Sequence, residues 1–559
     1  MRFLEIDLTE GGRLDPAILR KLDECARSAL ELFDEAIGAA SKNHLHDIDW
    51  WVSRPGTRNS FVSKLFARCA QILLVQTLLQ EGWRLKVYVD DSAMVSALRS
   101  IAHPALQVEF AARARHRARL AVRIMRDISS SIFHTIFAIA AAKFTRNGRR
   151  PLLHRNITAL DVFILRDSFS SGTFLNRYYP GLEDALTPDE QFRFVYIPIF
   201  YRVRNYFSLF RAMRRSHVNF LPVQDYLKAS DYAFAFGHWL RIRKIRTPSS
   251  VIFSGINIAS LIQAELWNGR FAQSTISALL QFRFWQKRVP AAIKTFVDWY
   301  EGQDIDHAAA AAIQWSGKPI EHIAFRPACS RLEISVFPAC HEISAGVVPP
   351  VMAVTGNGFR REIATCRPSL KTSLAPGFRY AGLTDLNREP NHVPTILVTL
   401  PLAEESVEAV AEFLRPLIGD DRLRSYRWLI KRHPAMPKAE VERLFSLSSG
   451  QFEFVDGVFH LWLRTVNMVI GLESSALLEA ISLNIPSLCL ASGNVPTVIP
   501  FPDWADRHLW RVCYDTNEAR LAIVEMLAGA SVAPLSSTLK QDLLSPATRA
   551  DIRRFLWLD

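Results

Sequence analysis

The stretch VIGLESSALLEAISLNIPSLCL, from Val469 to Leu490, predicts two buried strands joined by a helix. Its first residues form a short apolar run that stops at Gly471, which is typical of a strand covered on both faces. The serine pair and the apolar residues after it predict a helix, and NIP turns the chain into the second strand. Because parallel strands need such a helical crossover, the stretch predicts a doubly wound parallel sheet.

The same alternation continues through the rest of the C-terminal third. TILVTL, YRWLIKRHP and FEFVDG predict strands, and the periodic segments AEESVEAVAEFLRPLI and KAEVERLFSL predict the helices between them. Ligands of doubly wound sheets bind outside the carboxyl ends of the strands. KRHP, residues 431–434, and ESS, residues 473–475, both follow strands, so they stand where a ligand is expected.

Strand-like and helix-like segments also alternate in the first two thirds of the chain. The pattern weakens between residues 363 and 393, which are rich in Pro, Gly and polar residues. For 559 residues we expect two large domains or more. The sequence therefore predicts an α/β protein with an N-terminal domain at 1–362 that carries helical insertions, a linker at 363–393 and a C-terminal domain at 394–559. The N-terminal strands are expected in WRLKVYVDD, ALDVFILRDSFSSG, FRFVYIPIF, SVIFSGI, IKTFVDWYEGQ and PPVMAVTGNGF.

The chain is basic, with a formal net charge of +12. Six arginines lie between Ala112 and Arg126, and five more lie between Tyr201 and His217. Such a balance suggests an anionic partner, either a membrane surface, a phosphorylated substrate or a polyanionic acceptor, although each stretch is also typical of a solvated helix face. Nucleic acid is not expected, because the sequence has no aromatic-basic RNA motif and no helix-turn-helix signature.

The sequence also suggests a compartment. Its seven cysteines form no CxxC pair, so neither a disulfide framework nor a zinc site is indicated, and a reducing cytoplasm fits best. The first residues, MRFLEIDLTEGGRLD, lack the apolar core of a signal peptide. The segment SIFHTIFAIAAAKF, Ser131 to Phe144, is too short to span a bilayer, and we expect a buried helix there. The expected location is the cytoplasm, with any membrane association peripheral, at the inner face of the inner membrane.

Ser474 and Ser475 stand at the predicted start of a helix. Free backbone N–H groups and the helix dipole favour an anion there, and the two hydroxyls can donate to phosphate oxygens. Glu479, about one turn further on, is within reach of a ribose hydroxyl pair. The alternatives are a helix N-cap for Ser474 and a solvated helix residue for Glu479.

His433 follows a predicted strand and stands beside Lys431 and Arg432. A histidine in that position can donate to a phosphate and, when protonated, stabilise the charge that develops as the phosphate leaves. Pro434 stiffens the loop. The alternative is a loop histidine that only caps a turn.

The His-Pro pair followed by GLESSALLEA resembles the C-terminal nucleotide-binding half of GT-B glycosyltransferases. More narrowly, it is similar to bacterial sialyltransferases, polysialyltransferases and capsule or lipopolysaccharide transferases that use CMP-activated acidic sugars. Those families share a carboxylate pair followed by glycine, a His-Pro motif and a serine pair. The chain also resembles bacterial surface-carbohydrate biosynthesis proteins of similar length. The resemblance is strongest over residues 395–525 and thin over the first 290.

The resemblance implies a GT-B-like fold, in which two Rossmann-like doubly wound domains face a cleft. It also implies a nucleotide site. His433, Ser474 and Ser475 would bind the CMP phosphate, and Glu479 would contact the ribose. The nucleotide-binding set carried over from the motifs is Lys431, His433, Pro434, Glu473, Ser474, Ser475 and Glu479.

The first motif supplies the general base, and here the match is imperfect. DWYEGQ keeps Glu301 and its glycine but has a tyrosine in place of the preceding carboxylate. VYVDDSA keeps Asp90 and Asp91 but has serine in place of the glycine. Glu301 is preferred, because surface-carbohydrate relatives carry a similar Glu-x-Gln stretch before a helix, and Asp91 with Asp90 is the reserve. Asp298, Asp304 and Asp456 are weaker candidates. Structural roles explain each residue individually at least as well as catalysis does: a helix cap for Asp91 or Asp304, and a turn for Asp456-Gly457.

The resulting hypothesis is an inverting glycosyltransferase of bacterial surface polysaccharide synthesis. It would transfer a sialic acid, nonulosonate or Kdo-type sugar from a CMP-activated donor to a glycan or lipid-linked acceptor, with no cofactor and no metal required. His433 would act with Glu301 or Asp91 in catalysis. The alternatives are a GT-B transferase or epimerase that uses UDP- or CDP-linked substrates, a non-catalytic basic protein that binds a membrane or polyanion, and a structural partner in a polysaccharide export complex.

Overall fold

The computed structural model describes most of the chain. It covers residues 2–558 apart from 112, 147–155, 166–167, 170–171, 202, 328–336, 385, 403, 434–435, 446–451 and 529–536. Pro434, one of the predicted phosphate-loop residues, therefore lies outside the described residues. Within the described residues, the strands form three parallel sheets and a small antiparallel hairpin, β6 (Ile252–Phe253) with β7 (Ile256–Asn257).

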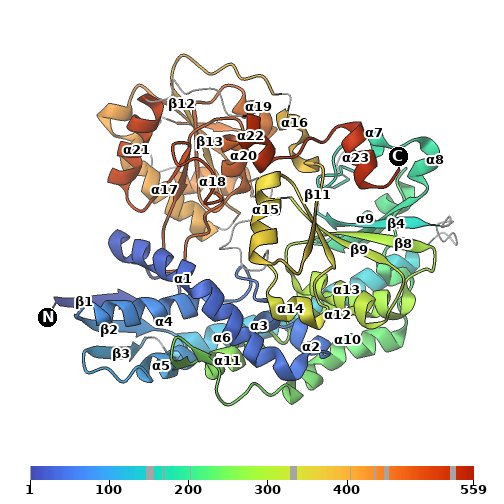
Figure 1. The fold of residues 1–559 in the computed structure, drawn as a ribbon, viewed down its shortest axis with the longest axis horizontal. Coiled ribbons are helices and arrows are strands. Elements are labelled where there is room, and N and C mark those ends of the chain that lie inside the picture. Colours follow the sequence, from blue (N-terminus) through green and yellow to red (C-terminus); the bar gives the residue numbers. More distant parts are fainter. Residues whose placement is uncertain are drawn as a thin grey trace.

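The first sheet is built from the first 110 residues and has three parallel strands. Its order is β1 (Arg2–Asp7), β2 (Trp83–Val89) and β3 (Leu106–Phe110). Leu85, Val87 and Val89 are buried, because alternate residues of a strand point to one face. The helices α4 (Leu65–Gln80) and α5 (Ser92–Arg99) pack on this sheet, and α1 (Pro16–Ser41) packs on α4. This sheet is visible at the lower left of Figure 1.

The second sheet has six parallel strands in the order β11-β10-β9-β8-β4-β5. From β4 the chain adds β5 on one side of the sheet, and from β8 it adds β9, β10 and β11 on the other side. The topological switch point therefore lies between β4 and β8. The helix α13 (Asp304–Trp315) follows β8. The strands are β4 (Ile157–Ile164), β5 (Phe194–Phe200), β8 (Ile293–Trp299), β9 (Glu321–Arg326), β10 (Val351–Val354) and β11 (Lys371–Leu374).

The third sheet lies in the C-terminal domain and has six parallel strands in the order β14-β13-β12-β15-β16-β17. This is the order 3-2-1-4-5-6 of dinucleotide-binding folds, with the switch point between β12 and β15. Every residue of β12, β15 and β16 is buried, as expected for parallel strands covered on both faces. The strands are β12 (Thr395–Thr399), β13 (Arg427–Lys431), β14 (Phe452–Val455), β15 (Met468–Gly471), β16 (Ser487–Leu490) and β17 (Trp510–Cys513).

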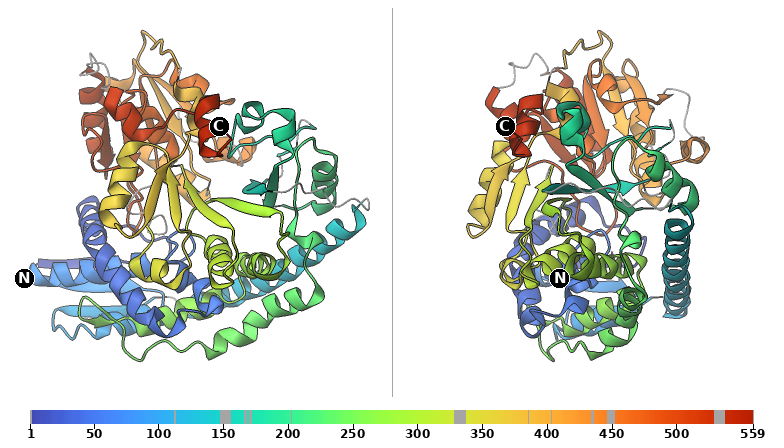
Figure 2. Two further views of the ribbon diagram at one scale, coloured as in Figure 1. Left: turned by 45° about the vertical axis from the view of Figure 1, so that its right-hand side comes forward. Right: turned by 90° about the vertical axis from the view of Figure 1, so that its right-hand side faces the viewer.

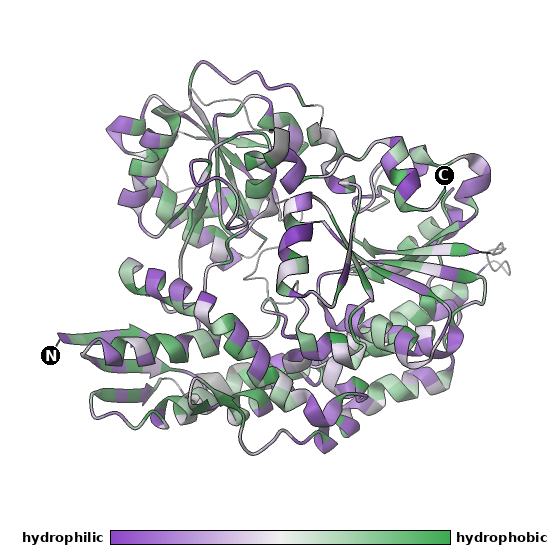
Figure 3. Ribbon diagram, viewed as in Figure 1, coloured by the Kyte–Doolittle hydropathy of each residue, from purple (hydrophilic) through white to green (hydrophobic). Residues whose placement is uncertain are grey.

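The two six-stranded sheets belong to two domains that lie next to each other (Figures 1 and 2), and residues of both domains line one cleft. Their strands are the hydrophobic interior of each domain, whereas the outer helices show mixed hydropathy (Figure 3). The predicted class is confirmed: the protein is α/β, with two doubly wound parallel sheets in a GT-B-like arrangement. The three-stranded sheet is an addition to that arrangement.

The chain between residues 363 and 393, expected as a linker, contains regular structure. It includes the end of α15 (Asn357–Cys366), the strand β11 and the short helix α16 (Ala381–Thr384). β11 pairs with β10 and so forms the edge of the N-terminal sheet. Further on, α22 (Ser537–Leu543) packs against α15, and α23 (Arg549–Phe555) packs against α7 (Leu182–Ala185). The chain therefore crosses back from the C-terminal to the N-terminal domain.

The segment Ser131–Phe144 differs from its prediction as a buried helix. It is the second half of α6 (Arg113–Phe144), and only one side of it is buried, including Ala138 and Ala141. Phe133 and Ile136 are among the side chains that it exposes. Among the described helices, none combines the length and the apolar composition of a membrane span.

Candidate functional site

One cleft of about 1430 Å³ brings together most of the predicted site residues. Glu301 lines it from the N-terminal domain, and His433, Ser474 and Ser475 line it from the C-terminal domain. The spatial convergence that the motifs require is therefore present. The roles of these residues stay predictions.

The serine pair stands at the switch point of the C-terminal sheet. Ser475 begins α20 (Ser475–Ile481), and Ser474 caps it by accepting a hydrogen bond from the backbone N–H of Ala476 at 3.3 Å. The strand before this loop approaches β12 very closely, because a Cβ at Gly471 would lie 2.5 Å from Thr399 Oγ1. Ser474 is thus both a helix cap and a cleft residue, so the two interpretations of it are compatible.

The loop after β13 presents His433 to the cleft but not Lys431. The imidazole is half-buried, and the His433 carbonyl accepts a hydrogen bond from the N–H of Met436 at 2.9 Å. Lys431 is buried, and its Nζ donates to the Gly457 carbonyl at 2.6 Å. Burial lowers the pKa of this ammonium group. Arg432 forms an ion pair with Asp456 at 2.9 Å, so both cations contact the segment at Asp456 and Gly457.

The two glutamates of the serine motif differ in position. Glu473 is exposed and lines the cleft. Glu479 is only 4% exposed, and its Oε2 lies 2.8 Å from Nε2 of His460 on α19 (Phe459–Leu463). Because the helix turns this side chain toward α19, the structure does not bring Glu479 to the cleft.

Glu301 follows β8, at the switch point of the N-terminal sheet. Trp299 Nε1 donates to Glu301 Oε1 at 2.8 Å, and Gln303 Nε2 donates to Oε2 at 2.6 Å. Each carboxylate oxygen keeps a further lone pair, so it can still accept a proton or a hydrogen bond. These two hydrogen bonds therefore hold the Glu301 side chain in one orientation just after the carboxyl end of β8.

Buried carboxyl groups fix the loop that carries Glu301. Asp306 Oδ2 accepts hydrogen bonds from the backbone N–H groups of Glu301 at 2.9 Å and Gln303 at 2.8 Å. Asp161 Oδ1 accepts one from the N–H of Trp299 at 2.6 Å. Burial, together with the nearby charge of Asp298, raises the pKa of both Asp161 and Asp306. Hydrogen bonds from the backbone of this loop to the buried Asp161 and Asp306 thus hold it in place.

Asp304 is a second carboxyl group in the cleft, three residues after Glu301. It is the first residue of α13. Burial raises the pKa of Asp304 to about 6, although hydrogen bonds from Ser274 and Thr275 oppose that effect. A group with this pKa changes its charge close to neutral pH, which is the range that acid–base chemistry uses.

The other candidate carboxylates occupy structural positions. Asp91 caps α5 by accepting from the N–H of Ala93 at 2.7 Å, and it forms an ion pair with Arg68 at 2.6 Å. It is buried and does not line the cleft, whereas its neighbour Asp90 does. Asp298 is buried against His322, with Oδ2 and Nε2 2.9 Å apart. The cap that the sequence offered as the alternative for Asp91 is what the structure contains.

Arg379 is a cleft residue that the sequence did not indicate. It lies in the short helical turn Phe378–Tyr380, inside the span expected as a linker, and GFRY carries no motif. The residue is exposed to solvent. Desolvation of its guanidinium lowers the pKa of Arg379, but Tyr380, Glu479 and other neighbours, including Glu301, raise it overall. Arg379 makes no hydrogen bond or ion pair with the described residues, so its guanidinium is available to a ligand.

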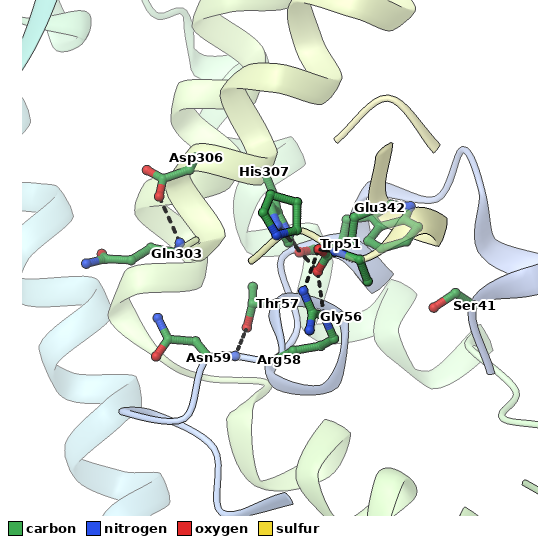
Figure 4. A network of polar contacts seen from close by, with 12 residues as sticks. Ser41, Trp51, Gly56, Thr57, Arg58, Asn59, Gln303, Asp306, His307 and Glu342 are labelled. Carbon is green, nitrogen blue, oxygen red and sulfur yellow. Dashed lines mark hydrogen bonds and ion pairs between the residues drawn. The ribbon is translucent and has the colours of Figure 1, made fainter. Parts of the chain in front are cut away.

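A buried ion network holds another part of the cleft wall (Figure 4). Arg58 donates from Nε and Nη2 to the two carboxylate oxygens of Glu342, at 2.8 and 2.7 Å, and from Nη1 to Asp34 at 2.6 Å. Burial alone would raise the pKa of Glu342, but Arg58 lowers it to about 2. The network anchors the segment whose Asn59 and Ser63 line the cleft. The sequence SRPGTRNS gave no signal for this role.

No family model and no curated protein sequence matches the chain. Several solved structures are similar. MnaA of S. aureus with UDP has 12% identity over 72% of this chain and 98% of its own, with a TM-score of 0.40. The UDP-GlcNAc 2-epimerase of Neisseria meningitidis bound to UDP-GlcNAc has 11% identity over 72% and 98%, with a TM-score of 0.39. MurG of Acinetobacter baumannii has 10% identity over 72% and 99%, with a TM-score of 0.36. At these values the likeness says nothing about function, and the GT-B-like assignment rests on the strand orders of the chain itself.

Proposed function

We propose that the protein is an inverting glycosyltransferase that uses a nucleotide-activated sugar. One observation carries the proposal: a carboxylate at the switch point of one sheet, two hydroxyls at the switch point of the other, and an imidazole from the loop after β13 line the same cleft. A transfer reaction needs a base for the acceptor on one side of the sugar and a stabilised leaving group on the other. Glu301 meets the first requirement, and His433, Ser474 and Ser475 meet the second.

The proposed reaction is a single displacement. Glu301 accepts the proton of an acceptor hydroxyl while that oxygen forms a bond to the anomeric carbon of the sugar. The bond between the anomeric carbon and the phosphate oxygen breaks, and its electron pair stays on the phosphate. His433 and the serine hydroxyls donate hydrogen bonds to the phosphate that leaves. The products are the glycosylated acceptor, with the opposite anomeric configuration, and the free nucleotide.

The proposed donor is a CMP-linked acidic sugar of the sialic acid, nonulosonate or Kdo type. The motif resemblance supports this choice, and Arg379 adds a physical reason. A guanidinium that no described carboxylate pairs with can bind the carboxylate of such a sugar, or a phosphate, through two hydrogen bonds. The proposed acceptor is a glycan or a lipid-linked glycan of a bacterial surface polysaccharide. Protein donors neutralise the phosphate in this scheme, which invokes no metal.

The nucleotide preference is the first test. We expect CMP to raise the melting temperature more than CDP, UDP or GDP, and we expect His433→Ala to abolish that shift. Loss of one charge-assisted hydrogen bond weakens binding by about 10- to 100-fold. His508→Ala is the matched control, because His508 is an exposed histidine of the same domain that does not line the cleft.

The outcomes separate the alternatives. A preference for UDP or CDP would move the proposal to a transferase or epimerase with that donor. Salt-sensitive binding to polyanions without any nucleotide preference would favour the non-catalytic basic protein. If no nucleotide shifts the melting temperature and the cleft carboxylates prove dispensable, a structural partner in an export complex becomes the better explanation.

A further inference from the structure

The outer face of α6 exposes many apolar side chains along its length. Seven large apolar residues of this helix are exposed, with exposed fractions from 39% to 80%. At about 100° per residue these positions fall on one side of the helix, so they form one apolar stripe along it. The residues are Val122, Met125, Ile132, Phe133, Ile136, Phe137 and Phe144.

The opposite face of the helix is fixed to the protein. Ser131 Oγ donates to the Phe271 carbonyl at 2.9 Å, and His134 Nδ1 lies 2.9 Å from the hydroxyl of Tyr206 on α9 (Tyr206–Arg215). Ala138 and Ala141 are buried on the same side. Figure 2 shows α6 running along the outside of the molecule. The stripe is therefore a stable feature of the surface, because the helix cannot turn it inward without breaking these contacts.

The surroundings of the stripe are basic. Arg126 and Lys143 are exposed on α6 itself, whose sequence contains Asp127 as its single acidic residue. The adjacent helix α9 packs on α6 and exposes Arg211 and Arg215, with no acidic residue in its sequence. An apolar stripe flanked by cations is the pattern of a helix that lies in the interface of an anionic bilayer.

We propose that this α6 face docks the protein on an anionic phospholipid bilayer, with the apolar stripe at the acyl boundary and the cations at the headgroups. A second copy of the chain is the less suitable occupant, because two such faces would bring like charges together. The docking does not depend on the transfer reaction. It has a consequence for the cleft, since Leu120, Arg123 and Arg126 of the same helix line it. Docking by α6 sets the mouth of the cleft close to the lipid surface.

Vesicle co-sedimentation of the full chain tests the proposal. We expect binding to vesicles of phosphatidylcholine with phosphatidylglycerol, and at least tenfold weaker binding to phosphatidylcholine alone. Phe133→Ser with Phe137→Ser should weaken binding to the anionic vesicles at least tenfold, because two aromatic rings no longer enter the lipid. Arg211→Gln with Arg215→Gln should weaken it several-fold per charge.

The matched control is Leu521→Ser with Val524→Ser, which removes two exposed apolar side chains from α21 (Thr516–Ala528) of the other domain. Ile136→Ser, at a 57% exposed position, is a second α6 variant that should fold even if the double variant does not. Circular dichroism and melting temperature report on folding. Equal loss in the control, equal binding to both vesicles, or no loss in folded α6 variants would overturn the proposal. A wild-type dimer that the α6 variants convert to a monomer, without vesicle binding, would overturn it in favour of a contact between copies.

Discussion

At the scale of single residues, the cleft sets two carboxyl groups in different environments. Glu301 accepts hydrogen bonds at both carboxylate oxygens, from Trp299 and Gln303. For Asp304, burial is the largest influence on the pKa of the carboxyl group. Pairs of carboxyl groups that differ in this way commonly divide acid and base work. Glu301 stays the preferred base, because its orientation is fixed by two donors and its loop is held by buried aspartates.

Replacing Glu301 by Gln should lower the transfer rate by about 10²- to 10⁴-fold, because the amide cannot accept the acceptor's proton. The nucleotide-induced shift in melting temperature should be retained, since the phosphate contacts come from the other domain. The measurement is nucleotide release with and without acceptor. Glu321→Gln, at an exposed position on β9 in the same domain, should have no effect. A fully active Glu301→Gln enzyme would transfer the role of base to Asp304.

The raised pKa of Asp304 predicts a pH-dependent stability difference. Its folded-state pKa of about 6 exceeds the ordinary value of 3.8, so the folded state holds an extra proton between those values. The stability that protonation brings is complete below 3.8 and lost as the pH rises through about 6. Asn imitates the neutral acid. Asp304→Asn should therefore raise the melting temperature at pH 8 by roughly 2–5 °C relative to wild type, and the gain should vanish near pH 4.

Melting curves of both proteins from pH 4 to pH 8 measure this difference. Asp189→Asn, at an exposed aspartate of the same domain, serves as the reference for a substitution without a buried carboxyl. A difference that is constant over the whole pH range would contradict the burial of Asp304.

At the scale of elements, apolar runs were the reliable signal. β12 and β15, in TILVTL and VNMVIG, are buried on both faces, and β8, in IKTFVDW, is buried from Phe296 onward, so these sequences specify strands without help from the rest of the chain. β11, with the sequence KTSL, was missed because an edge strand that is largely solvent-accessible needs no apolar pattern. The second half of α6 was mispredicted for the opposite reason, since its apolar residues exceed what the core buries.

The site could be predicted only where a motif stands at a strand end. His433, Ser474 and Ser475 follow strands whose ends face the cleft, and sequence position was enough to find them. The predicted ribose contact of Glu479 could not be decided from the sequence, because the rotation of the helix sets whether this side chain faces α19 or the cleft. Arg379 could not be predicted for a different reason. It lies outside any motif, and only the tertiary structure shows that the turn Phe378–Tyr380 reaches the cleft.

Gly471 is required where β15 meets β12. A Cβ there would lie 2.5 Å from Thr399 Oγ1, so Gly471→Ala should cost about 1–3 kcal/mol of unfolding free energy. Removing the obstructing hydroxyl in Thr399→Ala with Gly471→Ala should recover part of that loss. Denaturant unfolding measures both. Gly419→Ala, where a Cβ would meet its nearest neighbour at 3.6 Å, should change stability by less than about 0.5 kcal/mol. Equal stability of all variants would contradict the close approach at the switch point.

At the scale of the whole molecule, the two domains are joined more than once. After the C-terminal sheet, α22 and α23 return to the N-terminal domain, where Arg553 forms an ion pair with Glu190 at 2.8 Å. Ile552 and Leu556 are buried in the core that contains Tyr179, Phe325 and Phe378. The final helices thus belong to the N-terminal domain in packing, although they follow the C-terminal domain in sequence.

Ile552→Ala should therefore destabilise the N-terminal domain, by about 2–5 kcal/mol, because it leaves a cavity in that core. Hydrogen exchange followed by peptide mapping should show faster exchange in β4 and β8, with β12 and β15 unchanged. Trp557→Ala, at a 53% exposed neighbouring position, is the control and should leave all four strands unaffected. Faster exchange confined to the C-terminal strands would mean that α23 does not support the domain it contacts.

This returning helix imposes an order on biosynthesis. The N-terminal strands are synthesised before the C-terminal domain, whereas α23 is synthesised after it. The nascent N-terminal domain therefore exposes the apolar surface that α23 covers until the C-terminal domain has been translated. Chaperone binding should be strongest during that interval. A premature stop codon just before α23 should destabilise the N-terminal domain, although that domain is synthesised first.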